Sequence, residues 1–256
     1  MKILAVGDIV SSQGCDFLLS NLSKIKRHYG VDLTIVNGEN SAVGNGVLPS
    51  SAETIFTAGA DVITLGNHAF KRYEIYDYLD EKSDFIVRPA NFGDSAPGKS
   101  VCYVDLGSIK VAVANVMGHT YMDTPKSPFD VIDELLEGID AKIIIVDIHA
   151  EATSEKIAFA HYIDGKVSAV FGTHTHVQTA DEQILPNGTG YITDVGMTGP
   201  KQSALGVDVN CVISKFKTNL PTRFEISDNP CFLNAVLFEI DEKTGKTLSV
   251  ERIIVE

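Results

Sequence analysis

The sequence lacks a hydrophobic segment long enough to cross a membrane. Its longest apolar runs, such as Lys142–Ile148, have the length of a strand and contain or adjoin charged residues. The chain also begins directly with a predicted strand, Met1–Val6, without the basic and apolar regions of a secretory signal peptide. From these absences we predict a cytoplasmic protein that does not use a membrane.

Closely spaced cysteines and an excess of positive charge are missing as well. The chain has 21 Lys and Arg residues against 34 Asp and Glu, and its net charge is -13. Duplex nucleic acid is therefore not an expected partner, because binding to its phosphates requires clustered positive charge. A small anionic substrate is still compatible, since bound divalent metals can reverse the local potential of a site. No CxxC pair is present, which excludes a zinc ribbon and a thioredoxin-like motif. We interpret the four cysteines as reduced thiols: Cys15, Cys102, Cys211 and Cys231.

The sequence does contain a regular alternation of apolar runs and amphipathic segments. No stretch rich in Pro, Gly or Ser and no internal repeat interrupts it, so we predict a single domain over residues 1–256. The alternation predicts an α/β fold with helices outside a central sheet whose strands are buried on both faces. The predicted strands are Lys2–Val6, Leu33–Val36, Val62–Thr64, Val111–Asn115, Ile143–Ile148 and Ala169–Phe171, and the predicted helices are Gly14–His28, Ser50–Gly59, Arg72–Leu79, Pro128–Leu136 and Ser154–Tyr162.

The helical pattern fades from about Gln178 onward. Short segments rich in β-branched and aromatic residues follow, and we interpret this end of the chain as strands that complete a sheet. The predicted strands of this part are Gly190–Thr193, Cys211–Phe216, Phe232–Ile240 and Leu248–Val255.

Polar side chains follow five of the predicted strands at the point where each strand ends. In open α/β folds the carboxyl ends of strands line a shared crevice in which ligands collect. Each residue alone has an ordinary structural role, as a cap, a turn residue or a hydrogen-bonded core histidine. The coincidence at five strand ends favours a common site instead, built from Asp8, Glu39, Asn40, Asn67, His149, His174 and His176.

This set of side chains is suited to metal ions. Two carboxylates, two amide oxygens and three imidazoles, without thiolates, match Mn, Fe, Zn or similar ions. Because His174 and His176 are two residues apart, an extended segment would point both to the same side. The set is too large for one ion, and a carboxylate that bridges two ions about 3.5 to 4 Å apart gives the clamp that phosphoryl displacement needs.

At these motifs the sequence resembles the calcineurin-like metallophosphoesterases, and in particular their YmdB-like bacterial branch. The match covers nearly the whole chain. An isolated Gly-Asn-His is weak support for it, whereas the ordered series is strong. The series consists of Gly7-Asp8-Ile9-Val10, Asn37-Gly38-Glu39-Asn40, Gly66-Asn67-His68, Arg88-Pro89-Ala90-Asn91, Asn115-Val116-Met117-Gly118, the run from Asp147 to Glu155, and Gly172-Thr173-His174-Thr175-His176.

The resemblance implies a four-layer α/β-β-α sandwich and a dinuclear metal centre with Glu39 as the bridge. General metallophosphoesterases place a histidine two residues after the first aspartate, where this chain has Val10 and the similar branch uses Asn40 instead. Fe or Mn is expected, with Zn or Mg as alternatives. One ion would be held by Asp8, Glu39, Asn40 and His176, and the other by Glu39, Asn67, His149 and His174.

The resemblance also implies hydrolysis of small phosphoesters, with 2′,3′-cyclic nucleotides as candidate substrates, a regulatory role and assembly into homo-oligomers. His68 is the predicted general acid for the departing alkoxide, because it follows a ligand directly and histidine titrates near neutral pH; a supporting role beside the metals is the alternative. Asp147 and Glu151 are expected to orient His149. Asp194 either supports the last two histidines or anchors a turn.

The rim of the expected site departs from the pattern of similar proteins. Ala69-Phe70-Lys71 stands where a Trp-Asp pair is common, and His119 stands where Arg is usual. These departures leave the ligand set intact and bear on what enters the site. Two alternatives to a phosphodiesterase therefore stay open, a nucleotide-sensing regulator with little turnover and a metal-dependent phosphomonoesterase.

Overall fold

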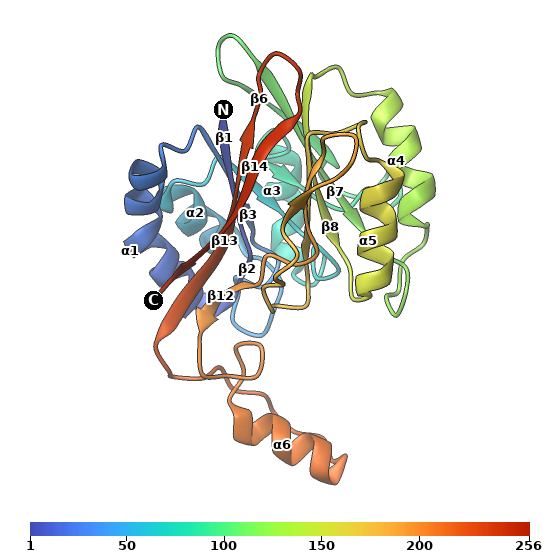
Figure 1. Cartoon of the computed structure of the whole chain (residues 1–256). Helices are drawn as coiled ribbons and strands as arrows, with labels where there is room; N and C mark the ends of the chain where they lie inside the picture. The colour runs from blue at the N-terminus through green and yellow to red at the C-terminus, as the bar shows by residue number, and fades with distance from the viewer.

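The computed structural model describes residues 1–256 and contains two β-sheets that pack face to face (Figure 1). The apolar cluster between the sheets includes Ile3, Ile35, Ile145 and Phe238. The first sheet has the order β2-β12-β13-β1-β3-β4-β5, with β14 paired to β13, and the second has the order β10-β11-β9-β8-β7-β6. The strands are β1 Lys2–Val6, β2 Asp8–Ile9, β3 Leu33–Asn37, β4 Val62–Thr64, β5 Ile86–Val87, β6 Val101–Asp105, β7 Lys110–Met117, β8 Ile143–His149, β9 Ala169–Thr173, β10 Gln183–Ile184, β11 Gly190–Ile192, β12 Met197–Pro200, β13 Cys231–Ile240 and β14 Thr247–Val255.

Helices cover the outer face of each sheet. On the first sheet, α1 (Ser11–Tyr29), α2 (Pro49–Ala58), the short 3₁₀ helix η1 (Tyr73–Ile75) and α3 (Tyr76–Glu81) contribute to one apolar cluster. On the second sheet, α4 (Pro128–Glu137) and α5 (Thr153–Tyr162) contribute to another. The predicted four-layer α/β-β-α sandwich is therefore confirmed.

The topology brings the carboxyl ends of both sets of parallel strands to the same end of the molecule. In the first sheet β1, β3, β4 and β5 are parallel, and in the second β7, β8, β9 and β11 are parallel. The Asn37 side chain, at the end of β3, donates to the Asp147 carboxylate near the end of β8 at 3.1 Å. The loops that follow β3, β4, β8 and β9 therefore surround one common space.

One predicted element is wrong. The segment Cys211–Phe216 is not a strand but lies within helix α6 (Val209–Thr218). The Asp208 carboxylate caps this helix by accepting hydrogen bonds from the backbone N–H groups of Asn210 at 2.8 Å and Cys211 at 3.3 Å. The β-branched and aromatic residues that favoured a strand lie here on an exposed helix.

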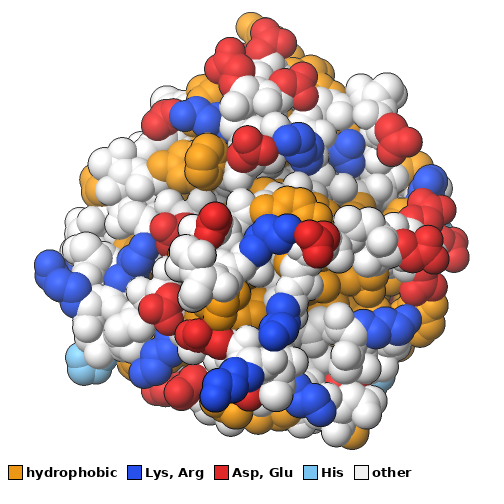
Figure 2. Space-filling model, turned by 90° about the horizontal axis from the view of Figure 1, so that it is seen from above, with side chains coloured by type: hydrophobic (Ala, Val, Ile, Leu, Met, Phe, Trp, Pro, Cys, Tyr) orange, Lys and Arg blue, Asp and Glu red, His pale blue; other side chains and the backbone are white.

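The surface seen in Figure 2 shows acidic and basic side chains interspersed, with hydrophobic side chains between them. Such a face has no field of a single sign. None of the helices combines the length and the apolarity that crossing a bilayer requires.

Candidate functional site

The seven side chains predicted as metal ligands lie in one connected cluster at the carboxyl ends of the strands. Short contacts link each member to at least one other, over distances of 3.0 to 3.5 Å. The sequence-based grouping of five strand ends into one site therefore matches their placement. Asp8 comes from β2, Glu39 and Asn40 follow β3, Asn67 follows β4, His149 ends β8, and His174 and His176 follow β9.

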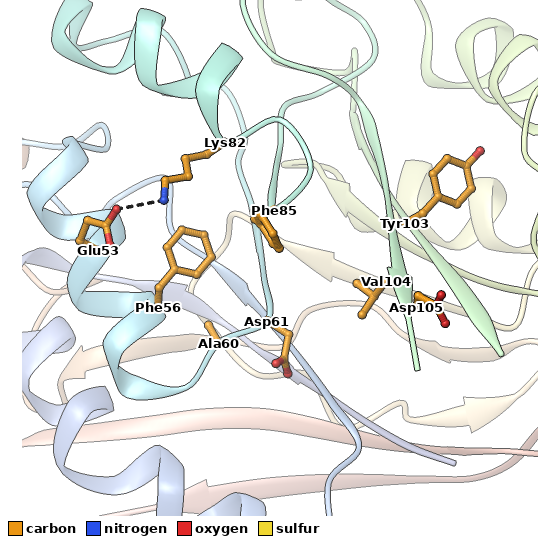
Figure 3. Close-up of a pocket in the computed structure, with 9 residues that line it drawn as sticks. All are labelled: Glu53, Phe56, Ala60, Asp61, Lys82, Phe85, Tyr103, Val104 and Asp105. Carbon is orange, nitrogen blue, oxygen red and sulfur yellow. Dashed lines mark ion pairs between the residues drawn. The ribbon is translucent and has the colours of Figure 1, made fainter. Parts of the chain in front are cut away.

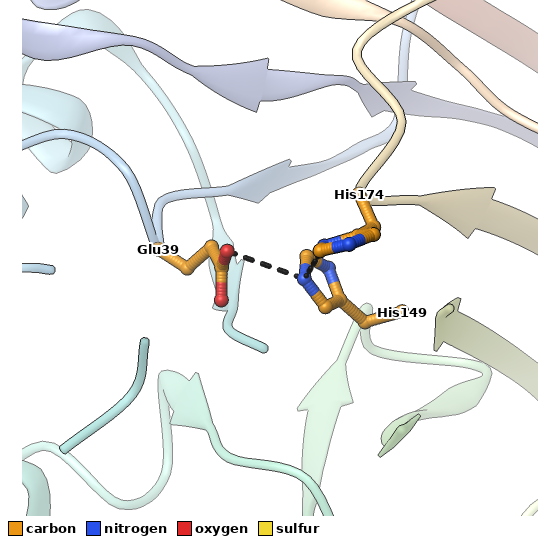
Figure 4. Close-up of side chains that lie close together, drawn as sticks. All are labelled: Glu39, His149 and His174. Carbon is orange, nitrogen blue, oxygen red and sulfur yellow. Dashed lines mark hydrogen bonds and ion pairs between the residues drawn. The ribbon is translucent and has the colours of Figure 1, made fainter. Parts of the chain in front are cut away.

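Glu39, His149 and His174 form the centre of the cluster (Figure 4). Nε2 of His149 lies 3.2 Å from Oε1 of Glu39, 3.0 Å from Nδ1 of His174 and 3.0 Å from Oδ1 of Asn67. One donor atom from each of Glu39, His149 and His174 lies within 4.8 Å of the others, as a shared metal ion requires. Gly66 permits this approach, because a Cβ there would lie 2.3 Å from both Glu39 and His149.

Asp8, Asn40 and His176 form the other half of the cluster. Nε2 of His176 lies 3.5 Å from Oδ1 of Asp8 and 3.2 Å from Nδ2 of Asn40. Nδ2 of Asn40 also faces Glu39 Oε1 at 3.1 Å, while its Oδ1 faces His68. Rotating the amide by half a turn exchanges the positions of its nitrogen and its oxygen. In the rotated orientation, Asn40 would offer its oxygen to a metal ion.

The backbone around His174 and His176 is not extended as expected. Both residues have positive φ, 99° and 62°, a conformation that histidine adopts uncommonly. The two rings reach the cluster because the chain turns at these residues. The prediction that an extended segment would point both rings to the same side is wrong. The turn is held from two directions, since Asp8 accepts a hydrogen bond from the His174 N–H at 3.2 Å and the Leu205 carbonyl lies 3.3 Å from Nδ1 of His176.

A buried ion pair beneath this turn is not visible from the motifs. Lys156 of α5 is fully buried, and its Nζ donates to Asp194 at 2.6 Å and to the Thr173 carbonyl at 2.7 Å. The same Asp194 carboxylate accepts from the backbone N–H of Thr175 at 3.1 Å and from its hydroxyl at 2.8 Å. Of the two roles considered for Asp194, it therefore supports the histidine turn, and its other oxygen also binds the N–H of Gly196.

His149 is oriented through Thr173. Nδ1 of His149 lies 2.8 Å from the Thr173 hydroxyl, which donates to Asp147 at 2.7 Å. We expected Asp147 to orient His149, and it does so through the Thr173 hydroxyl. The Asp147 carboxylate does not contact the His149 ring directly. Glu151 does not orient His149 either, because its carboxylate lies 3.0 Å from Nε2 of His174. Holding the far nitrogen of His149 leaves Nε2 aimed at the centre of the cluster.

The electrostatics of the cluster favour a bound cation. Burial alone would raise the pKa of the Glu39 carboxyl, but His149 and His68 outweigh it and hold that pKa well below its usual range. Burial likewise opposes a charge on His149, but Glu39 and Asp8 raise its pKa to about 9. Burial, and then the charge of His149, lower the pKa of His174 to about 4. The two buried carboxylates thus attract positive charge, which a metal ion at this place would supply instead of protons on His149 and His176, since Asp8 and Glu39 raise the pKa of both histidines.

His68 lies beside the cluster and is partly open to solvent. Its Nδ1 is 3.0 Å from Oδ1 of Asn40 and 3.1 Å from Oε1 of Glu39, and 24% of its side chain is exposed. Its backbone N–H donates to the other Glu39 oxygen at 2.9 Å. The position at the cluster edge matches the one expected from its place after Asn67.

The residues of the unusual rim are held in different ways. Ala69 is buried, and the Phe70 ring packs edge-on against Phe92, with 4.9 Å between centroids. Lys71 is exposed. Nδ1 of His119 lies 2.9 Å from the Thr124 hydroxyl. The Phe70 ring thus packs against another aromatic ring. Of the altered rim residues, only Lys71 places a charged group without an ion-pair partner in solvent.

A separate cavity of about 480 Å³ lies away from this cluster (Figure 3). Phe56, Phe85 and Tyr103 contribute to its apolar wall, and an ion pair of 3.4 Å between Glu53 and Lys82 lies at its edge. None of the seven clustered side chains lines it, so it is not part of the candidate site.

Comparison with known proteins places the chain within one family. The family model described as YmdB-like protein matches residues 4–253. A 2′,3′-cyclic-nucleotide 2′-phosphodiesterase of Bacillus subtilis is 46% identical over all of this chain and 97% of its own length. A putative phosphatase/phosphodiesterase of Mycoplasma pneumoniae is 38% identical over 99% of this chain and 92% of its own.

Solved structures agree with this assignment. A hypothetical protein from Thermus thermophilus has a TM-score of 0.93 and 38% identity, covering 99% of this chain and 98% of its own. A novel phosphatase from Mycoplasma pneumoniae also has a TM-score of 0.93, at 36% identity over 100% of this chain and 93% of its own. A putative 5′-nucleotidase from Staphylococcus aureus shares the fold alone, with a TM-score of 0.57 at 17% identity over 100% of this chain and 54% of its own. The resemblance predicted from the motifs is therefore confirmed, and the chain belongs to the YmdB-like protein family.

Proposed function

We propose that the chain is a metal-dependent phosphodiesterase that hydrolyses 2′,3′-cyclic nucleotides. The observation that carries the proposal is the convergence of Glu39, His149 and His174, the first two of them fully buried, with four further ligand-type side chains. The names of the Bacillus subtilis and Mycoplasma pneumoniae relatives support phosphoester hydrolysis, and the former supports the cyclic nucleotide as substrate. A small anionic substrate suits an acidic chain if metals supply the positive charge at the site.

Two metal ions fit the donor set of this cluster. Bound there, they would act as Lewis acids toward the phosphoryl oxygens and lower the pKa of water. We assign Asp8 and His176 to one ion and His149 and His174 to the other, with Glu39 between them. Asn40 would complete the first set and Asn67 the second. Fe or Mn suits this mixture of oxygen and imidazole donors, with Zn or Mg as alternatives.

The whole chain, residues 1–256, is in this proposal one catalytic domain. The first strand, β1, pairs with β13 near the other end of the chain, and the apolar cluster between the sheets joins Ile3 to Phe238. The seven clustered side chains span Asp8 to His176, so neither half of the chain carries the site alone.

Removal of single ligands tests the proposal. Asp8→Asn and His174→Ala should each abolish metal-dependent cleavage of 2′,3′-cyclic AMP and of a chromogenic phosphodiester, because each removes a charged or coordinating group from the cluster. Metal content measured on the same samples should fall, while Asp105→Asn, in the separate cavity, should behave as the unaltered chain. Undiminished turnover in both ligand variants would contradict the proposal.

His68 is assigned as the general acid that protonates the leaving oxygen. It lies at the edge of the cluster, and its exposed ring can reach a substrate that the cluster holds. His68→Gln should slow hydrolysis of a diester with an alkoxide leaving group by about 10²- to 10⁴-fold. The same variant should retain most activity on a nitrophenyl ester, whose leaving group needs no proton. Equal loss on both esters would instead indicate that His68 supports Glu39 and Asn40.

A second candidate function is a metal-dependent nucleotide sensor with little turnover, motivated by the altered rim at Phe70 and His119. Calorimetry with 2′,3′-cyclic AMP, followed by chromatography of the nucleotide, separates the two. Tight binding of a nucleotide that stays intact would favour the sensor, whereas rapid product formation would reject it. Rates on matched mono- and diesters distinguish a phosphomonoesterase, which the relative named phosphatase/phosphodiesterase also supports.

A further inference from the structure

A cavity of about 320 Å³ is lined by the aromatic rings of Phe70, Tyr76 and Phe92. The Phe70 ring lies edge-on to the other two, with 4.9 Å between its centroid and that of Phe92 and 5.6 Å to that of Tyr76. No charged side chain lines this cavity, although the chain as a whole carries a net charge of -13. The volume is near the lower end of the range for ligand pockets, about 300 to 1,000 Å³. The cavity therefore suits one small, uncharged ring system.

The aromatic cavity lies at the same end of the first sheet as the candidate site. Phe70 follows β4 and Phe92 follows β5, so both residues come after the carboxyl ends of neighbouring parallel strands. Phe70 is two residues from His68, and the Cα atoms of the two are therefore at most about 7 Å apart. The Lys71 N–H donates to the His68 carbonyl at 3.0 Å and closes this stretch into a turn. One short turn thus joins the cavity to the candidate site.

The Tyr76 ring is held in place and is still accessible. Its hydroxyl donates to the Phe70 carbonyl at 3.0 Å, and 37% of the residue is exposed. A ring that is already ordered loses little conformational freedom when a flat ligand stacks on it. Tyr76 is therefore a suitable stacking surface at the open side of the cavity.

The larger cavity in Figure 3 is less suited to a group that is bound together with the clustered ligands. Asp61 precedes β4 and Phe85 precedes β5, so this cavity lies at the opposite end of the same strands. Three carboxylates and the Lys82 ammonium group also line it. Of the two, only the aromatic cavity combines an uncharged lining with a position near His68.

We propose that the aromatic cavity binds the base of the nucleotide while its cyclic phosphate lies at the clustered ligands. This inference rests on the proposed function and deepens it. An uncharged lining matches an uncharged base, whereas the phosphate requires the positive charge that metals supply. The ribose, which separates base and phosphate, would lie along the turn between His68 and Phe70. Because every base has a π-face, stacking on Tyr76 accepts different bases, and we expect cyclic nucleotides of several bases to be cleaved.

Steady-state kinetics on two substrates tests the cavity. Tyr76→Ala should raise the KM for 2′,3′-cyclic AMP about 5- to 100-fold and change kcat much less, because it removes a stacking ring. The KM for 1-O-methylribose 2′,3′-cyclic phosphate, which has no base, should stay the same. Tyr76→Phe keeps the ring and should recover most of the lost affinity. Tyr103→Ala is the matched control, since Tyr103 is 42% exposed and lines the separate cavity.

Fluorescence measures the same contact independently of turnover, because substrate and product both carry the base. The chain has no tryptophan, so Tyr76→Trp introduces a single reporter into the aromatic cavity. Addition of 2′,3′-cyclic AMP should quench its emission, and the base-free cyclic phosphate should not. Tyr103→Trp, the control, should respond to neither compound. Circular dichroism should show all variants folded.

The inference would be overturned by an unchanged KM for 2′,3′-cyclic AMP in Tyr76→Ala, or by equal losses on both substrates. Cleavage of both substrates without quenching in Tyr76→Trp would also reject the cavity, while leaving the proposed hydrolysis intact. Quenching by the nucleotide in a chain that cleaves neither substrate would instead support the cavity and reject hydrolysis.

Discussion

The turn that carries His174 and His176 differs from helix α6 in how its conformation is stabilised. The turn has an unfavourable backbone conformation and buried contacts, whereas α6 has a regular conformation and no buried residue. The turn holds two histidines at positive φ, which costs energy at each residue, and buried contacts from Asp194 and Asp8 hold it in place. Helix α6 has ordinary helical geometry and a cap, but none of its residues is buried. Conformation at the candidate site is therefore set by tertiary contacts, whereas that of α6 is set locally and lacks a tertiary partner within the chain.

The largest change in stability is expected when the ion pair beneath the turn, between Lys156 and Asp194, is removed. Lys156→Met should lower the free energy of unfolding by about 3 to 5 kcal/mol, because it leaves the Asp194 carboxylate buried without its cation. Denaturant unfolding of the metal-free protein measures this loss. Lys166→Met is the control, since Lys166 pairs with Asp133 at the surface, where an ion pair contributes at most about 1 kcal/mol. Equal stability of Lys156→Met and the unaltered chain would contradict the role given to the pair.

A smaller effect is expected from the hydroxyl that orients His149. Thr173→Val keeps the shape of the side chain but removes the link between Nδ1 of His149 and Asp147. We expect metal affinity to fall about 10- to 100-fold, as is usual when a partner of a ligating histidine is lost. Titration calorimetry of the metal-free protein measures it. Thr34→Val is the matched control, because the buried Thr34 hydroxyl has no hydrogen-bond partner. Similar affinities in the two variants would remove Thr173 from this role.

The strands that carry the site were predictable because their apolar runs are almost continuous. Val62–Thr64 was predicted and is strand β4 with the same bounds, and the predicted Ile143–Ile148 is one residue shorter than β8. Polar residues immediately after such strands can be assigned to one end of a sheet by topology alone. This is why the placement of His149 could be anticipated from the sequence.

The contacts that shape the site could not be predicted in the same way. Positive φ at His174 depends on hydrogen bonds from residues far away in the chain, and so does the path from Asp147 through Thr173. A signal for Lys156 was present, since it shares a helical face with the buried residues Phe159 and Ala160. A lysine on an apolar face indicates a buried partner but does not say which one.

The wrong prediction of Cys211–Phe216 has a related cause. Val212, Ile213 and Phe216 favour strands by propensity, and a ten-residue helix offers few turns over which helical periodicity can be recognised. The decisive local signal is Asp208, whose side chain caps the helix. Because the apolar side chains are exposed, their pattern says more about a partner than about the fold of the single chain.

The smallest effect on stability is expected from α6 itself. Ile213→Ser should change the free energy of unfolding by less than about 0.5 kcal/mol, since Ile213 is 48% exposed and removes little apolar surface from water within one chain. Denaturant unfolding of this variant and of the unaltered chain at equal concentration gives the difference. A loss of 2 kcal/mol, on the order expected for a core isoleucine, would mean that α6 folds back onto its own chain, and the contrast with the histidine turn would disappear.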